Sequence, residues 1–321
     1  MRVGAAGRDR EFALSEVIGF VLLLGVIITA MALWMMYIVP VNGREAEIAQ
    51  MDTVKDRFTD YKISLDAPWV NSPYGSPWSQ EGVLLSTSMN LGTGGGDTQV
   101  SGLFLPMMNP ISSSATLTVI DRGDEMTITS FGPGDTSPIS KNYTLSVLEY
   151  QSQNNYWLQQ KYYYQTGGVF LSQLNGSTCR ISPPISFVNN SDLTDTVTII
   201  PITLDGTGSI GGSGPVRVDS RLKTLPPPDT GTKYWVNTSV SVANFTTAQM
   251  WLDMFNSTRK AGGIFNPQNY SRGNSSPSTI PGVAYMNITG YYNDLSHADV
   301  NLYVQPVNYS VTINNIVSNL I

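Results

Sequence analysis

The sequence predicts a mainly β protein, α+β overall, in which a long N-terminal helix precedes a β-sandwich-like head. Three observations predict this fold class. Residues 12–41 hold an apolar run with no charge between Glu16 and Arg44, and residues 44–66 are highly charged with apolar residues three or four apart. The remainder is built from short β-branched or alternating segments separated by turns rich in glycine and proline. Helical and strand-like patterns therefore occupy separate parts of the chain.

Residues 12–41 are the predicted membrane helix. About 25 apolar residues at about 1.5 Å each give roughly 37 Å, enough to cross a hydrocarbon core of about 30 Å with some tilt. The preceding segment, residues 1–11, carries Arg2, Arg8 and Arg10. Because basic residues beside a membrane segment tend to stay in the cytoplasm, we expect a single-pass protein with its N-terminus inside. Everything after Val41 is then outside the cell.

Two ordinary explanations also fit this segment. The first is a secretory signal, since Ala30-Met31-Ala32 has the form of a cleavage site. It is disfavoured because the apolar part of such a signal spans about 7 to 15 residues, whereas residues 33–39 stay apolar beyond the cut. The second is a plain uncleaved anchor in which Glu16 lies at the cytoplasmic interface, where a carboxylate costs little. This second explanation stays open.

Residues 12–16, FALSE in one-letter code, follow a short basic leader and begin the apolar helix, and residues 15–20 are SEVIGF. This arrangement resembles the processing region of type IV prepilins, in the version of archaeal pilins and archaellin-like proteins. The resemblance implies that a prepilin-type peptidase removes residues 1–11, just before Phe12, and that helices of many copies pack into a filament core. It also implies that Glu16 pairs with the new terminal amine of a neighbouring subunit, which offsets the cost of a charge in lipid.

Glu11 precedes the implied cut. The family usually has glycine or another small residue at that position, and in this chain the small residues of the leader lie at 4–7, farther upstream. The alternative is therefore a pilin-like membrane protein that keeps its leader and does not polymerise. The expected partners are the membrane, copies of this chain or other pilin-like subunits, and the processing peptidase if the leader is cleaved.

Residues 42–66 predict an extracellular amphipathic stalk helix. Ten charged residues lie within 44–66, and the apolar positions recur every three or four residues, as on one face of a helix. Pro40, at the junction with the membrane helix, should kink the helix or restart it. The apolar face packs either on the protein's own head or on another subunit, and both remain open at this point. The apolar positions are Ile48, Met51, Val54, Phe58, Tyr61 and Leu65.

Residues 82–321 predict the β-rich head. Alternating or β-branched runs at 83–91, 115–120, 126–129, 144–148, 196–200 and 308–313 predict strands. One further helix is predicted at 247–260, where four large apolar residues fall on one face. About 240 residues can bury a core as one large domain or as two small ones, with a boundary near 206–230.

Asparagine usage favours an extracellular, glycosylated head. The pattern N-x-S/T, with x not proline, occurs ten times, all of them after the predicted membrane helix. Chance placement of 23 asparagines in a chain this rich in serine and threonine would give roughly four such sites. The excess suggests N-glycosylation, although an Asn- and Ser-rich β protein inflates the count by itself. The candidate sites are Asn142, Asn175, Asn189, Asn237, Asn244, Asn256, Asn269, Asn274, Asn287 and Asn308.

The sequence offers little for catalysis. Cys179 is the only cysteine and His297 the only histidine, so neither an intrachain disulfide nor a histidine-paired zinc site is expected. A net charge of −6 without a basic face argues against nucleic acid as a partner. We therefore expect no enzymatic activity, no metal and no cofactor. The tyrosine-rich run at 156–164 is the place to look for an aromatic binding site, although aromatic residues in strands more often pack in a core.

These observations together predict a pilin-like structural subunit or accessory protein of an archaeal cell-surface filament, with adhesion as a plausible purpose. The alternative is a non-polymerising, single-pass surface or binding protein that uses the apolar helix only as an anchor. An ectoenzyme is the least supported class, because no residue of the sequence can be named as its catalytic group.

Overall fold

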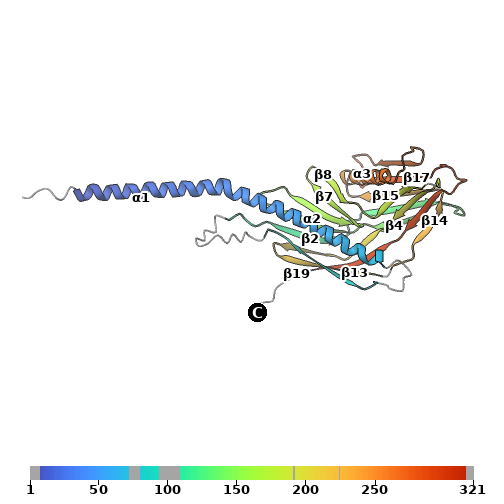
Figure 1. Ribbon diagram of the computed structural model, residues 1–321, viewed down its shortest axis with the longest axis horizontal. Helices are drawn as coiled ribbons and strands as arrows, with labels where there is room; N and C mark the ends of the chain where they lie inside the picture. The colour runs from blue at the N-terminus through green and yellow to red at the C-terminus, as the bar shows by residue number, and fades with distance from the viewer. Residues whose placement is uncertain (1–7, 72–79, 94–108, 191, 224, 316–321) are drawn as a thin grey trace, which may run out of the picture.

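A computed structural model describes residues 8–71, 80–93, 109–190, 192–223 and 225–315, with side chains from Val17 onward. One long helix leads into a head made mostly of strands, and its N-terminal half projects away from that head (Figure 1). The chain is therefore mainly β with a long N-terminal helix, as the sequence predicts.

The N-terminal helix continues without a break for 64 residues, as the sum of three adjoining segments of 26, 5 and 33 residues. Helix α1 spans Arg8–Leu33, a π-helical turn covers Trp34–Ile38, and helix α2 spans Val39–Asn71. Proline has no N–H to donate, and the wider turn before Pro40 absorbs this defect, with the Val39 N–H bonded to the Trp34 carbonyl. Figure 1 shows the helix changing direction near this turn. Pro40 therefore bends the helix and does not restart it.

Helix α2 packs along the protein's own head. Its buried residues recur every three or four positions, so they form one face of the helix. The sequence left open whether this face packs on the protein's own head or on another subunit, and in the structure it packs on the head. Five of the six predicted apolar positions are buried, and Ile48 is half-buried. The buried residues are Val39, Gly43, Glu47, Met51, Val54, Phe58, Tyr61, Leu65 and Pro68.

The described residues of the head form four sheets. In spatial order, the first contains β1 (Leu84–Asn90), β13 (Pro215–Leu222), β19 (Val307–Asn315) and β11 (Ile202–Asp205). The second contains β14 (Asp229–Lys233), β18 (Val300–Val304), β10 (Asp195–Ile199) and β9 (Ile185–Asn189). The third contains β12 (Gly208–Gly212), β2 (Ser114–Ile120), β5 (Val147–Gln153), β6 (Gln160–Gln165), β7 (Gly168–Gln173) and β8 (Gly176–Ile181). The fourth contains β16 (Tyr270–Asn274), β17 (Gly282–Ile288), β15 (Trp235–Val242), β3 (Glu125–Phe131) and β4 (Ile139–Thr144).

Two bent strand pairs join the two four-stranded sheets. Strands β10 and β18 pair in parallel in one sheet, and their continuations β11 and β19 pair in parallel in the other. The bends contain Pro201 and Pro306, which suit a strand end because proline cannot donate to a ladder. Within the described part of 206–230, the chain contributes β12, β13 and the start of β14 to three different sheets.

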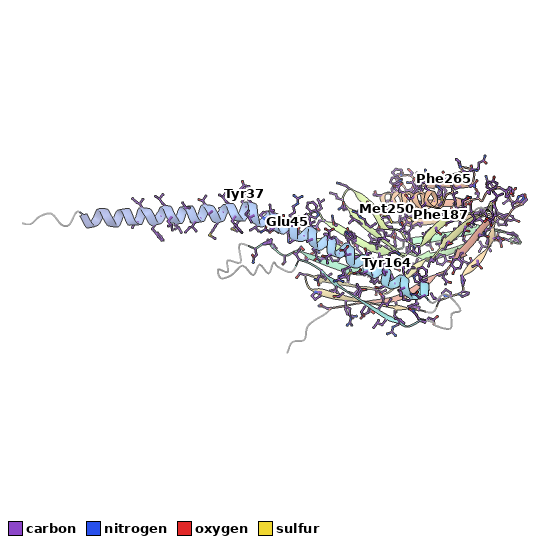
Figure 2. All side chains as sticks on the ribbon, viewed as in Figure 1. Tyr37, Glu45, Tyr164, Phe187, Met250 and Phe265 are labelled. Atoms are coloured by element: carbon purple, nitrogen blue, oxygen red, sulfur yellow. The ribbon has the colours of Figure 1, made fainter. Side chains whose placement is uncertain are left out.

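The six-stranded sheet is a layer shared by two hydrophobic cores. On one face Tyr164 packs edge-on against Tyr61 of α2, with ring centroids 5.2 Å apart. On the other face Phe170 packs against Trp251 of α3 (Phe245–Ala261), at 5.5 Å. Successive side chains of a strand point to opposite faces of the sheet. Tyr162 and Tyr164 therefore lie in the core beside α2, and Tyr163 lies in the core beside α3. Figure 2 shows Tyr164 inside the head, so these tyrosines are core residues and not an exposed binding site.

One local prediction is wrong. Residues 144–148 do not form one strand, because Leu145 and Ser146 separate β4 from β5, which belong to different sheets. The Arg122-Gly123-Asp124 turn joins β2 and β3, which also lie in different sheets. Asp124 is 6% exposed and accepts a hydrogen bond from Gln165 Nε2 at 2.9 Å. Arg122 and Gly123 are exposed, so the turn is solvated except at Asp124.

Candidate functional site: the apolar helix and its joint with the head

The apolar helix is not covered by the other described residues. Between Val17 and Ile38 only Met31 is half-buried, and every other side chain is exposed. Twenty-two residues at about 1.5 Å each give roughly 33 Å, close to the thickness of a hydrocarbon core. Among the described residues, one helix is long and apolar enough to cross a membrane, and it is this one. Large exposed apolar surfaces mark contacts with lipid or with other proteins.

Small residues leave a shallow depression on this helix. The depression includes Gly25, where an added Cβ atom would meet no atom of the described residues within 4 Å. Thr29 donates its hydroxyl proton to the Gly25 carbonyl at 2.8 Å, so the hydroxyl is satisfied within the helix. Val21, Val26 and neighbouring residues form the walls of the depression. Such a surface allows a second helix to approach closely without the cost of an unpaired polar group.

Glu47 fastens the helix to the head. Its side chain is fully buried, and its two carboxylate oxygens accept the backbone N–H groups of Asn155 and Tyr156 at 2.6 and 2.8 Å. A buried carboxylate is costly unless hydrogen bonds to the charged form compensate for lost water, and here two do so. The accepting residue lies on α2 and both donors lie in the loop between β5 and β6, so one residue connects the helix to the six-stranded sheet.

The same loop makes two further contacts with the first turns of α2. A Cβ atom at Gly43 would lie 2.4 Å from the Tyr156 ring, so the ring fits there only because the helix carries glycine. The Arg44 guanidinium lies 4.4 Å from the centroid of the Trp157 ring, a cation–π contact. Gly43, Arg44 and Glu47 together form the collar, a name used below for these residues and the loop at 154–159.

Farther along α2, hydrogen bonds continue to the sheet of β1, β13 and β19. Gln50 donates to the Asn90 carbonyl at 2.9 Å, and the hydroxyl groups of Tyr61 and Ser220 are hydrogen-bonded at 2.9 Å. Tyr309 donates to the Leu65 carbonyl. Burial raises the pKa of Tyr61, so its phenol stays neutral. The helix is thus held from the collar to its last turns, and the apolar segment continues from it as one helix.

The sequence predicted the apolar residues of α2 but not the collar. Glu47 was one of ten charges in the segment, and charged residues usually face water. The spacing of Glu47 could have indicated its burial, because positions 43, 47 and 51 follow at four-residue intervals and so lie on one face of the helix. The donors at 155 and 156 are more than a hundred residues away in sequence, and no local pattern indicates them.

The predicted processing residues lie in the first turns of α1. The backbone of Glu11, Phe12 and Glu16 is helical, while their side chains are outside the part described. Phe12 and Glu16 are therefore about one turn apart. Cleavage before Phe12 and pairing of Glu16 stay predictions.

All ten candidate glycosylation sites lie in the head, and their exposure differs. Asn142, Asn175, Asn189 and Asn244 are exposed, whereas Asn269 is 3% exposed. The remaining five, half-buried, are Asn237, Asn256, Asn274, Asn287 and Asn308. Asn244 also serves as the N-cap of α3, since its side chain accepts the Thr247 N–H at 2.9 Å. Asn189 Nδ2 donates to Asp195 Oδ1 at 2.8 Å, so Asn142 and Asn175 are the exposed sites that can be modified without the loss of such a hydrogen bond.

Within the described residues, no three side chains among His, Cys, Asp and Glu are placed to hold a metal ion. His297 is exposed, with Nδ1 3.0 Å from Asp294 Oδ2 and its ring stacked on Tyr292 at 4.3 Å between centroids. Burial raises the pKa of the Cys179 thiol to about 11, which leaves it protonated and weakly nucleophilic at neutral pH.

Comparisons with known proteins identify no relative. No protein-family model, no curated protein and no solved structure matches this chain.

Proposed function

We propose that this protein is a pilin-like structural subunit or accessory protein of an archaeal cell-surface filament. In this proposal the helices of neighbouring copies pack along Val17–Ile38 into a core, and their sandwich-like heads face outward. The supporting observation is the continuity between an uncovered apolar helix and a helix built into the head. A tether needs only attachment to the membrane, whereas a filament subunit needs its head held at a fixed position relative to its core helix.

The proposed topology places the N-terminus in the cytoplasm and the head outside the cell. Arg2, Arg8 and Arg10 support this orientation, and so does the location of all ten glycosylation patterns in the head. The proposed maturation removes residues 1–11 by a prepilin-type peptidase. Glu16 then pairs with the amine of Phe12 on a neighbouring copy, so two charges that are costly in lipid compensate each other.

Cysteine cross-linking in native membranes tests the assembly. Leu22→Cys and Leu24→Cys, in a Cys179→Ser background, place two thiols about 200° apart around an exposed helix. A core in which each helix touches several neighbours should give a ladder of multimers on oxidation. The matched control is Ser278→Cys, an exposed head position, which should stay monomeric. Monomers alone from the helix variant would contradict the proposal.

The second candidate is a non-polymerising surface protein anchored by the same helix. Glu11 favours it, because a large charged residue occupies the place where the resembled family has a small one before the cut. This candidate predicts a retained leader and a monomer in mild detergent. The cross-linking result above distinguishes the two functions.

A further inference from the structure

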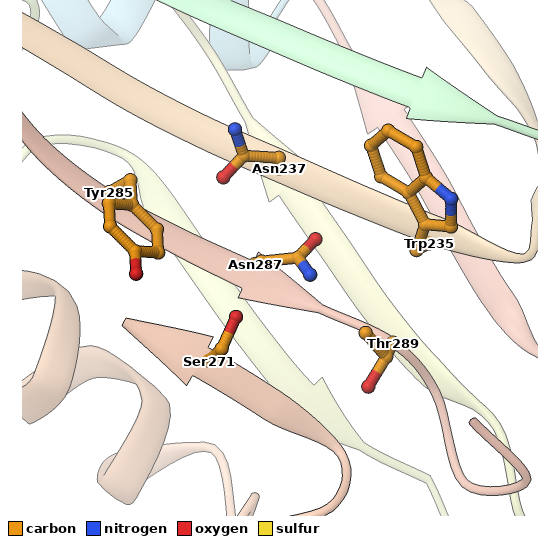
Figure 3. A pocket seen from close by; sticks show the side chains of 6 residues that line it. All are labelled: Trp235, Asn237, Ser271, Tyr285, Asn287 and Thr289. Atoms are coloured by element: carbon orange, nitrogen blue, oxygen red, sulfur yellow. The ribbon is translucent and has the colours of Figure 1, made fainter. Parts of the chain in front are cut away.

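A groove lies on the outer face of the five-stranded sheet. It has a volume of about 440 Å³ and is formed by residues of β15, β16 and β17 together with the residue after β17 (Figure 3). The lining side chains are Trp235, Asn237, Ser271, Tyr285, Asn287 and Thr289. The face opposite this groove is packed against α3 in the core, so the groove is on the solvent side of a rigid layer.

Strand register puts the polar groups in a row across the groove. Asn237 on β15 is directly opposite Asn287 on β17, and Asn287 is opposite Ser271 on β16. Neighbouring strands are about 4.8 Å apart, so the three side chains present polar atoms at regular short intervals. The row continues on the other side of Asn237 with Thr129, whose hydroxyl is hydrogen-bonded to Ser140 at 2.9 Å.

Aromatic rings flank this row on two sides. Tyr285 lies two residues before Asn287 on β17, and Trp235 lies two residues before Asn237 on the antiparallel strand β15. The two rings are therefore at opposite ends of the row along the strand direction, and Figure 3 shows them on either side of the two amides. Aromatic faces offer flat apolar contact area beside the polar groups.

Among the described residues, the Oδ1 atoms of Asn237 and Asn287 have no hydrogen-bond partner. By contrast, Asn274 on the adjacent strand donates to Gln249 at 2.7 Å. An unpaired buried amide oxygen is unfavourable. The last side-chain bond of asparagine rotates easily, so each amide oxygen can turn toward a hydroxyl group of a ligand in the groove.

The chemistry of the lining side chains indicates which class of ligand fits the groove. None of the six side chains is charged, so the groove offers no partner for a charged ligand. Amide and hydroxyl groups both donate and accept hydrogen bonds, which suits a ligand rich in hydroxyl groups. The flanking rings suit a ligand that also has apolar C–H faces. We propose that this groove binds a neutral carbohydrate chain.

Asn237 and Asn287 are also glycosylation patterns, and this constrains the proposal. Because they face each other, a glycan attached to either would occupy the groove. Free ligand and attached glycan therefore exclude each other. The proposal requires both asparagines to be unmodified in the native protein, which mass spectrometry of tryptic peptides measures. A glycan on either residue in most copies would overturn it.

The binding test uses the full chain in detergent and immobilised neutral polymers of glucose, mannose or galactose, with a polyuronate as the charged control. We expect retention by at least one neutral polymer, measured by interferometry. Asn287→Asp should weaken it by about tenfold or more, while Asn175→Asp, the same change at an exposed turn, should stay within about twofold. Trp235→Ala should act like Asn287→Asp, and Phe265→Ala, an exposed aromatic outside the groove, should act like Asn175→Asp.

Two controls belong to the same experiment. One excludes unfolding of the variants, and the other identifies the source of the ligand. Circular dichroism melting of each variant excludes unfolding, and Tyr285→Ala is a second groove variant in case Trp235→Ala does not fold. To distinguish a glycan of a neighbouring copy from a foreign polysaccharide, the chain itself, with and without its N-glycans, is offered as competitor. Equal binding by groove and control variants, or no retention by any neutral polymer, would overturn the proposal. Since no groove residue lies on the N-terminal helix, the result is independent of filament assembly.

Discussion

Glu47 is the residue on which the joint between helix and head depends most. The Glu47→Gln substitution keeps the shape of the side chain. It leaves one of the two backbone N–H groups facing an amide nitrogen in place of a carboxylate oxygen. We expect the free energy of unfolding to fall by about 1–3 kcal/mol, because a buried donor loses its acceptor. Chemical denaturation of the full chain in detergent measures it. Glu45→Gln, on the exposed side of the same turn, should change stability by less than about 0.5 kcal/mol, and an equal effect of both would refute the role of Glu47.

The raised pKa of the Cys179 thiol predicts how the stability of the protein changes with pH. Burial raises the pKa of its thiol from 9.0 to about 11, so the folded state holds the proton that the unfolded state releases earlier. The contribution of this group to stability is therefore complete below pH 9 and is lost as the pH rises toward 11. At pH 8, alkylation by iodoacetamide should be much slower for folded protein than for protein in denaturant. Equal rates in the two states would contradict the burial of this thiol.

At the residue scale, the sequence was sufficient for positions whose role follows from periodicity. Phe58, Tyr61 and Leu65 were predicted on one helix face and are buried there. Glu47 and the amides of Asn237 and Asn287 were not predicted in their structural roles, because their neighbours come from distant segments. Local patterns indicate which face a residue lies on, and they do not indicate which strand lies opposite it.

At the scale of the helix, two glycines provide a matched pair of tests. Gly43→Ala places a Cβ atom 2.4 Å from the Tyr156 ring, and we expect a loss of about 1–3 kcal/mol from the resulting overpacking. Gly25→Ala meets no atom within 4 Å and should leave the unfolding of the head unchanged. Denaturation of both variants under identical conditions measures the difference. A Gly43→Ala protein as stable as the Gly25→Ala protein would mean that the collar does not pack closely.

Strands and helices were predicted more accurately than their connections. The alternation at 115–120, 126–129 and 308–313 corresponds to β2, β3 and β19, and the helix predicted at 247–260 is α3. The prediction failed at 144–148 because apolar residues continue through a corner where the chain passes from one sheet to another. Pairing such as that of β13 between β1 and β19 joins segments far apart in sequence, which no local pattern encodes.

At the scale of the whole molecule, the chain combines an uncovered apolar helix with a head that holds the continuation of that helix. Figure 2 shows Tyr37 on the projecting part and Glu45 close to the head, so the change from exposed to packed helix occurs within about two turns. This short transition supports a fixed position of the head relative to the helix. The groove on the five-stranded sheet is a separate feature of the same head.

The N-terminus of the protein isolated from its native membranes is the most direct test of the proposed function. Mass spectrometry of the terminal peptide measures it without any mutation. The proposal predicts a chain that begins at Phe12, which would mean that the leader is removed despite Glu11. A chain that keeps residues before Phe12 would contradict the filament proposal and favour the anchored surface protein. A chain that begins just after Ala32 would contradict both, because the protein would then have lost most of its apolar helix.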